Sequence, residues 1–198
     1  MKKIVAGALI LASVNLGGAA AAEHIVKKGD TMWKIASKYQ VGISEIKNAN
    51  PQIENLDIIY PGQVIMIPEA NSKVQNYENE VIRLVNEIRA QNGLSPLKAD
   101  WQLSRVARFK SQDMKDKKYF SHQSPTYGSP FEMIKNFGIS FKAAGENIAY
   151  GYKTPQAVVN SWMNSSGHRA NILNSTYNKI GVGYVESGNY WTQMFIRQ

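Results

Sequence analysis

The sequence contains no cysteine among its 198 residues. Disulfide bonds, thiolate metal sites and cysteine nucleophiles are therefore excluded. The remaining composition, with 43% hydrophobic and 19% charged residues, is typical of a globular protein. The length suits one ordinary domain plus a small one, and no internal repeat is evident.

Runs of like charge are also missing, although the formal net charge is +8. Lys and Arg are interspersed with Asp and Glu, and no nucleic-acid-binding motif occurs, so the charge indicates a solvated surface and no nucleic-acid partner. A basic protein also suits an anionic cell wall, because long-range attraction acts on any polyanion.

Long apolar segments are absent beyond the N-terminus. Lys2 and Lys3 precede an apolar run at 4–16, and small residues offer a cleavage site just before Glu23. We therefore expect residues 1–22 to be a secretory signal peptide. The run is too short to span a membrane comfortably, and no later segment is long enough. The mature chain is predicted to be secreted, without a transmembrane segment, from a bacterium with one membrane and a thick wall.

The first unit after this signal has the predicted order strand, helix, helix, strand. Strands are expected at 24–27 and 64–67, and the second helix begins at Ser44 and ends at Asn50 and Pro51, because the residue before a proline disfavours helical geometry.

The first helix follows a turn at Gly29 and Asp30, where the Asp30 carboxylate is placed to cap the helix. Trp33 and Ile35 have helical spacing and are expected in the core of the unit.

This run resembles a LysM module over nearly its whole length, 23–68. The matching pieces are V-x-x-G-D-T-M-W-x-I-A at 26–36, Asn50–Pro51 and Pro61–Gly62–Gln63. The resemblance implies binding of a glycan that contains N-acetylglucosamine, meaning peptidoglycan or chitin. The implied groove is formed by two loops, whose residues are Gly29, Asp30, Thr31, Met32, Leu56, Asp57, Ile58 and Ile59. Met32 and Ile58 would cover sugar faces, while Asp30 alternatively serves only as a helix cap.

Residues 69–76 are polar and lack apolar periodicity, which predicts a linker. From 77 to 198 the pattern predicts a larger α+β domain, with several helices around a small, mainly antiparallel sheet. Asp100, Ser129 and Thr154 are expected to cap three of these helices. The last two strands are predicted to form a hairpin.

Three polar residues in this domain are candidates for one cleft. His122 follows Phe120 and Ser121, Glu146 lies between a glycine and an asparagine, and His168 is expected where the helix that opens at Thr154 stops. Such a set can hold a divalent metal, move a proton, or form a network that only stiffens the cleft. The residues are far apart in the sequence, so only the fold can bring them together.

From about Tyr77 to the end, the chain resembles a cysteine-free bacterial CAP domain, of the family of cysteine-rich secretory proteins, antigen 5 and pathogenesis-related 1. The architecture is also similar to that of sporulation-associated CAP proteins. The matching pieces lie at 85–89, 120–122, 144–148, 159–162, 167–173 and 180–184.

The resemblance implies an α-β-α sandwich with a central cleft lined by a His-Glu-Glu-His tetrad. His122, Glu146 and His168 match three members of this tetrad, but Ser165 stands where the second glutamate is usual. The lost carboxylate lowers the affinity for a cation and weakens acid–base chemistry that needs two carboxylates. His122 and His168 remain as ligands for a loosely held zinc ion completed by water.

Neighbouring residues have simpler interpretations. Asn147 and Asn171 are expected to brace irregular backbone through hydrogen bonds, and Glu146 alternatively does no more than accept backbone N–H groups. Ser166 lacks a nucleophile elbow, so we expect it to cap a helix end. The residues expected in the core are Trp162, Trp191 and Phe195.

These patterns support three functional hypotheses. The leading one is a wall- or spore-associated binding protein, which is held on glycan by the LysM module and presents the CAP cleft to a protein or lipid ligand. The alternative is an extracellular hydrolase of peptide or glycan bonds, in which the cleft histidines activate water directly or through zinc. The third is a lipid or sterol carrier, which would need an apolar groove. A fold resemblance alone does not decide among them.

Overall fold

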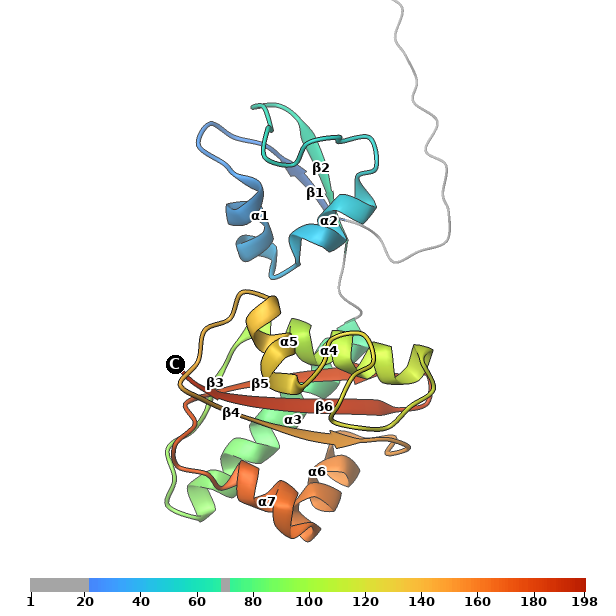
Figure 1. The fold of residues 1–198 in the computed structure, drawn as a ribbon. Helices are drawn as coiled ribbons and strands as arrows, with labels where there is room; N and C mark the ends of the chain where they lie inside the picture. The colour runs from blue at the N-terminus through green and yellow to red at the C-terminus, as the bar shows by residue number, and fades with distance from the viewer. Residues whose placement is uncertain (1–21, 69–71) are drawn as a thin grey trace, which may run out of the picture.

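The computed structural model describes residues 22–68 and 72–198, which form two modules joined end to end (Figure 1). Apart from Ala22, the predicted signal peptide lies outside the described residues. Within the described part, no helix combines the length and apolar character needed to cross a lipid bilayer.

The first module is a two-stranded antiparallel sheet packed against two short helices. Its elements are β1 (Ala22–Ile25), α1 (Met32–Tyr39), α2 (Ile43–Ala49) and β2 (Val64–Ile67). The strand register pairs Ala22 with Ile67 and Ile25 with Val64. Apolar residues from all four elements bury one another between the sheet and the helices. The predicted order of elements is therefore present, with the first strand two residues earlier than expected.

Two predictions for α1 are wrong. Trp33 is 64% exposed, because Ile35 and Ala36 form the inward face of the helix and Trp33 lies on another side. The N-cap is Thr31, whose hydroxyl accepts from the backbone N–H of Lys34. The Asp30 carboxylate instead accepts from the Lys27 backbone N–H and contacts the His24 ring, each through the same oxygen.

The predicted linker is shorter than residues 69–76. Helix α3 (Ser72–Gln91) already begins within it. Val74 and Tyr77 pack against the core of the second module, and Val81 follows at helical spacing. This early apolar stripe is sparse among polar residues, which explains why the pattern was not evident in the sequence.

The second module contains a four-stranded sheet with the strand order β3-β5-β6-β4. Its strands are β3 (Lys98–Ala99), β4 (Ala143–Ala149), β5 (Lys179–Val185) and β6 (Tyr190–Arg197). Besides α3, its helices are α4 (Trp101–Asp116), α5 (Pro130–Asn136), α6 (Pro155–Asn164) and α7 (Ser166–Ile172). Strands β4, β5 and β6 are antiparallel, whereas the short β3 is parallel to β5. Strand β4 is therefore an edge of the sheet.

Helices cover both faces of this sheet (Figure 1). One apolar cluster joins the sheet to α3, α6 and α7, and it contains Trp162, Trp191 and Phe195 without solvent exposure. A second cluster joins the opposite face to α4 and α5. These two cores confirm the predicted α-β-α sandwich and the predicted burial of the three aromatic residues.

The predicted helix starts in this module are present. Asp100 accepts from the backbone N–H of Leu103, and Thr154 accepts from that of Ala157. Ser129 and Glu132 form a reciprocal capping box at the start of α5. Each cap satisfies backbone donors that the first helical turn leaves free.

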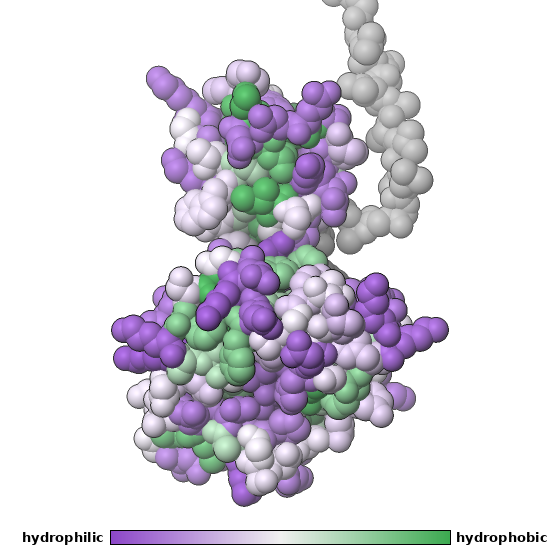
Figure 2. Space-filling view, in the orientation of Figure 1, coloured by the Kyte–Doolittle hydropathy of each residue, from purple (hydrophilic) through white to green (hydrophobic). Residues whose placement is uncertain are grey.

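One ion pair connects the two modules. The Arg105 guanidinium of α4 donates to both carboxylate oxygens of Glu45 at 2.7 and 2.8 Å, and to Ser44 at 2.7 Å. It also lies over the rings of Phe109 and Phe137, 5.0 and 5.3 Å from their centroids. The space-filling view narrows at this junction (Figure 2). Because the pair is partly exposed, we expect it to contribute about 1 kcal/mol at most.

The close approach of α4 to β5 gives a first testable prediction. A Cβ at Gly183 would lie 2.1 Å from backbone atoms of Ala107 and Arg108, so Gly183→Ala should lower the free energy of unfolding by about 2 kcal/mol or more. Denaturant unfolding measures this value. Gly167→Ala, in α7 with no heavy atom within 4 Å of the new Cβ, should leave stability equal or slightly higher. Equal stability of both variants would contradict the tight contact.

Candidate functional site

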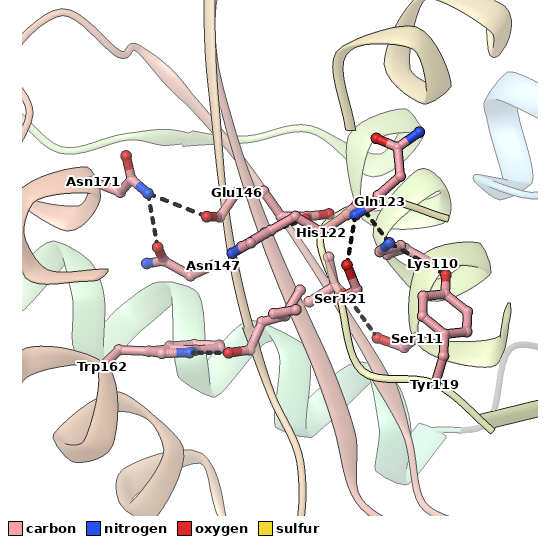
Figure 3. Close-up of polar contacts among 12 residues, drawn as sticks. Lys110, Ser111, Tyr119, Ser121, His122, Gln123, Glu146, Asn147, Trp162 and Asn171 are labelled. Carbon is pink, nitrogen blue, oxygen red and sulfur yellow. Dashed lines mark hydrogen bonds and ion pairs between the residues drawn. The ribbon is translucent and has the colours of Figure 1, made fainter. Parts of the chain in front are cut away.

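The predicted polar residues meet at the edge strand β4. Glu146 and Asn147 are neighbours on this strand and point to opposite faces of the sheet. His122 reaches the strand from the loop between α4 and α5 (Figure 3). His168 belongs to α7, on the other helical layer. The predicted residues are thus grouped at one edge of the sheet, between the two helical layers.

His122 and Glu146 are in direct contact. The Nδ1 atom of His122 lies 2.7 Å from Oε1 of Glu146, and the side chains are 54% and 1% exposed, respectively. A carboxylate at Nδ1 accepts its hydrogen and leaves Nε2 as the acceptor of a neutral imidazole. This pair can therefore accept a proton or a hydrogen bond from a bound ligand.

The second carboxylate oxygen of Glu146, Oε2, is buried and has no hydrogen-bond partner among the described residues. Burial raises the pKa of Glu146, while the hydrogen bond from His122 and the charge of Lys110 act in the opposite direction. An unpartnered buried carboxylate oxygen is costly, so this position is suited to accept one further donor.

His168 lies near this pair without touching the carboxylate. Burial lowers the pKa of His168, and the nearby His122 lowers it further. The prediction that His168 stands where the preceding helix stops is wrong, because Ser165 is extended and separates α6 from a new helix, α7. Ser165 is the N-cap residue of α7, although its side chain makes no capping bond. Ser166 is the first helical residue, so the capping role expected for it is also wrong.

Two asparagines join α7 to β4 through hydrogen bonds, as braces of the kind predicted, although the backbone that they hold is regular. Asn147 donates to the backbone carbonyl of His168 at 3.1 Å and to the Gln193 side chain at 2.9 Å. Asn171 donates to the backbone carbonyl of Glu146 at 3.2 Å and to the Asn147 side chain at 2.9 Å (Figure 3). These four bonds fix the backbone that carries both Glu146 and His168.

Helix α4 holds the His122 loop through two buried charged residues. The Lys110 ammonium donates to the backbone carbonyl of His122 at 2.8 Å. The Asp113 carboxylate accepts from three hydroxyl groups of the loop, those of Tyr119, Ser124 and Thr126, at 2.6 to 2.7 Å. The loop is thereby tied to a helix packed on the sheet, which gives His122 a defined position.

Sequence reasoning missed Lys110 and Asp113. Lys110 is only 1% exposed, and burial lowers its pKa, opposed by the charges of Glu146 and Asp113. A signal was present, because Lys110 lies four residues after Val106 and four before Met114, within the apolar stripe of the helix. A lysine in such a stripe indicates a buried partner.

The residues present fit a tightly held zinc ion poorly. Protein zinc sites use three or four side-chain ligands. Within residues 22–68 and 72–198, no three His, Asp or Glu side chains are grouped closely enough to hold a metal ion. His122 and His168 supply two imidazoles, and Glu146 is bonded to His122 in the manner of an outer-shell carboxylate. Zinc binding by the two histidines stays a prediction, and no step below depends on it.

The predicted glycan groove of the first module has one clear correction. Met32 is buried in the module core at 5% exposure, so it cannot cover a sugar face. Ile58 is exposed, as are Gly29, Thr31 and Asp57, while Asp30, Leu56 and Ile59 are half-buried. The two loops therefore offer backbone groups and a single large exposed apolar side chain, Ile58.

Comparison with known proteins identifies both modules. The sequence profile of the cysteine-rich secretory protein family, CAP, matches residues 82–195, and that of the LysM domain matches residues 24–68. The chain therefore belongs to the CAP family, and it carries a LysM domain before the CAP domain.

Individual relatives agree with this assignment. The uncharacterized protein YkwD of Bacillus subtilis is 65% identical over 127 residues, which are 64% of this chain and 49% of YkwD. The crystal structure of an extracellular SCP-domain protein from Bacillus anthracis has 35% identity and a TM-score of 0.62, covering 70% of this chain and 47% of that one. The chain thus spans about half the length of these two proteins.

A third relative matches a shorter stretch of the chain. SpoIVD-associated factor A of Bacillus subtilis is 48% identical over 52 residues, which are 26% of this chain and 13% of that protein.

The three hydrogen bonds that Asp113 accepts from the loop, called here the Asp113 anchor, give a second prediction. Burial raises the pKa of Asp113, but its three hydroxyl partners outweigh burial, so the net pKa is below the usual range. Ionised Asp113 therefore stabilises the fold fully above about pH 4, and this contribution is lost as the pH falls through the lowered pKa. Asp113→Asn should cost about 2 kcal/mol at pH 7, and the difference from the wild type should shrink in acid.

Denaturant unfolding from pH 7 down to about pH 3 measures this difference. Asp116→Asn is the matched control, because Asp116 lies on the same helix with its side chain 49% exposed. A cost at Asp113 no larger than that at Asp116 would rule out the anchor.

Proposed function

We propose that this protein is a secreted binding protein of the bacterial cell wall or spore, which is held on peptidoglycan by its LysM domain and presents the His122–Glu146 cleft to a ligand. The LysM match over 24–68 carries this proposal. The extracellular description of the Bacillus anthracis protein supports a location outside the cell, and similarity to the spore coat assembly protein ExsA of Bacillus cereus supports an association with the spore.

The structure of the LysM domain suits attachment to a glycan. The loops at 29–32 and 56–59 carry exposed residues on a small, well-packed frame. Backbone amides in such loops can hold acetamido groups, and Ile58 supplies an apolar contact for one sugar face. Because both domains belong to one chain, attachment through the LysM domain also keeps the CAP domain at the wall.

The attachment is tested by a substitution in the groove. Ile58→Asp should reduce retention of the full-length mature protein on purified peptidoglycan at least tenfold, because a charge would replace the apolar contact. Ile25→Asp is the matched control, since Ile25 is similarly exposed on β1, outside the two loops. Co-sedimentation measures both. Undiminished retention of the Ile58 variant would contradict attachment through this groove.

Hydrolysis is a second candidate, which the His122–Glu146 contact favours. A carboxylate that orients an imidazole, with Nε2 open to a ligand, is an arrangement that can activate water. The opposing observation is Ser165, which stands where a second carboxylate would supply the other half of an acid–base pair.

The two candidates differ in a product assay. If the cleft only binds, neither wild type nor His122→Ala should release soluble sugars or peptides from purified walls over a day, because no bond is cleaved. Chromatography of the supernatant measures release. Products from the wild type that fall a hundredfold or more with His122→Ala would establish hydrolysis and reject the binding-only role.

A further inference from the structure

Beside the His122–Glu146 pair lies a trough that the proposed function does not yet use. Its first part has a volume of about 430 Å³ and is lined by Phe120, Tyr150, Tyr152, Trp162 and His168, among others. A second hollow of about 440 Å³ adjoins it, because Tyr152 and Ser161 line both. The two hollows together form a trough along α6, from Ala157 to the C-cap residue Ser165, and His168 lines its first part.

Aromatic rings line the first hollow of this trough. Tyr150 is 57% exposed and Phe120 is 47% exposed, although both are large apolar rings. Their centroids are 4.8 Å apart in an edge-to-face contact, and Tyr190 stacks on Tyr150 at 6.0 Å. The rings support one another without being covered by other described residues, so they offer a preformed apolar surface to a ligand.

Neutral polar groups dominate the second hollow, which is lined by Asn160, Ser161, Asn164 and Ser165, together with Tyr152 and Ala157. The Ser161 hydroxyl donates to that of Tyr152 at 2.8 Å, which fixes two of these groups. Amides and hydroxyls can both donate and accept hydrogen bonds, so the second hollow is suited to the hydroxyl and acetamido groups of a ligand.

Charged residues are absent from the lining. Among the described residues that line the two hollows, none is Asp, Glu, Lys or Arg. A charged ligand would lose its hydration there without gaining a counter-ion. Ser165, which replaces the second tetrad glutamate, contributes to this neutrality. The lining thus matches an uncharged ligand that has apolar faces and a polar rim.

We propose that the trough binds N-acetylated sugar residues of the same glycan that the LysM domain holds, with Tyr150 and Phe120 stacked on sugar faces and the Asn160–Ser165 segment bonded to their polar groups. This inference rests on the proposed function and adds a second glycan subsite, in the CAP domain. Attachment by LysM raises the local concentration of the strand, so a weak subsite is sufficient. A bound strand would extend to His168.

Backbone-amide NMR of the full-length mature chain, titrated with the tetramer of N-acetylglucosamine, tests the inference. Two separate groups of amides should shift, one in the loops at 29–32 and 56–59 and one at 150–152 and 160–165. Tyr150→Ala and Phe120→Ala should weaken binding at the second group at least tenfold and leave the first unchanged. Phe131→Ala is the matched control, since Phe131 is also 47% exposed but lies on α5, outside the trough.

Each of the other possible outcomes of the titration contradicts one specific part of the proposal. Shifts confined to the LysM loops would overturn the second subsite and leave the proposed function intact. No shifts in either group at millimolar tetramer would overturn both. An equal loss in Phe131→Ala, or trough shifts with a fatty acid or an apolar peptide but not with the tetramer, would overturn the sugar assignment. The amide spectra also show directly whether each variant is folded.

Discussion

The close packing of α4 on the sheet is the constraint on which the cleft depends. Gly181 and Gly183 of β5 lack side chains where α4 crosses, and a Cβ at either position would lie within 2.4 Å of the helix backbone. Because the helix lies so close to the sheet, Lys110 and Asp113 are near enough to form hydrogen bonds with the loop that carries His122. The position of His122 therefore depends on two glycines of β5.

Features encoded by a few adjacent residues could be predicted from the sequence. Asp100 and Thr154 cap helices with their own side chains, and Trp162 lies on the apolar stripe of α6. The sandwich and the convergence of His122 with Glu146 came from the resemblance to a family, because no local rule relates residues 24 positions apart. Periodicity alone would have left these two residues unrelated.

Features that depend on tertiary contacts were missed. Trp33 has helical spacing, but three smaller apolar residues on its helix already fill the little core of the LysM domain, so Trp33 faces outward. The first turns of α3 are polar in sequence and become helical because Val74 and Tyr77 pack against the core of the second module, to which α3 belongs. The charge of Lys110 suggests a surface site, yet Glu146 and Asp113 make its burial tolerable.

The charges near His122 depend on three residues, Glu146, Lys110 and Ser165. Glu146 is a buried carboxylate, and Lys110 is a buried ammonium. The positive charge of Lys110 partly balances the negative charge of Glu146 without direct contact, because the ammonium donates to the His122 backbone carbonyl. With Ser165 in place of a second carboxylate, the cleft has no excess of negative charge to attract a divalent cation. The same loss leaves the adjoining trough lined by aromatic, amide and hydroxyl groups. The serine at position 165, which the family resemblance places where a glutamate is usual, would thus both weaken a metal site and leave the surface on which we propose that an uncharged ligand lies. This surface is beside an imidazole whose Nε2 faces no described partner.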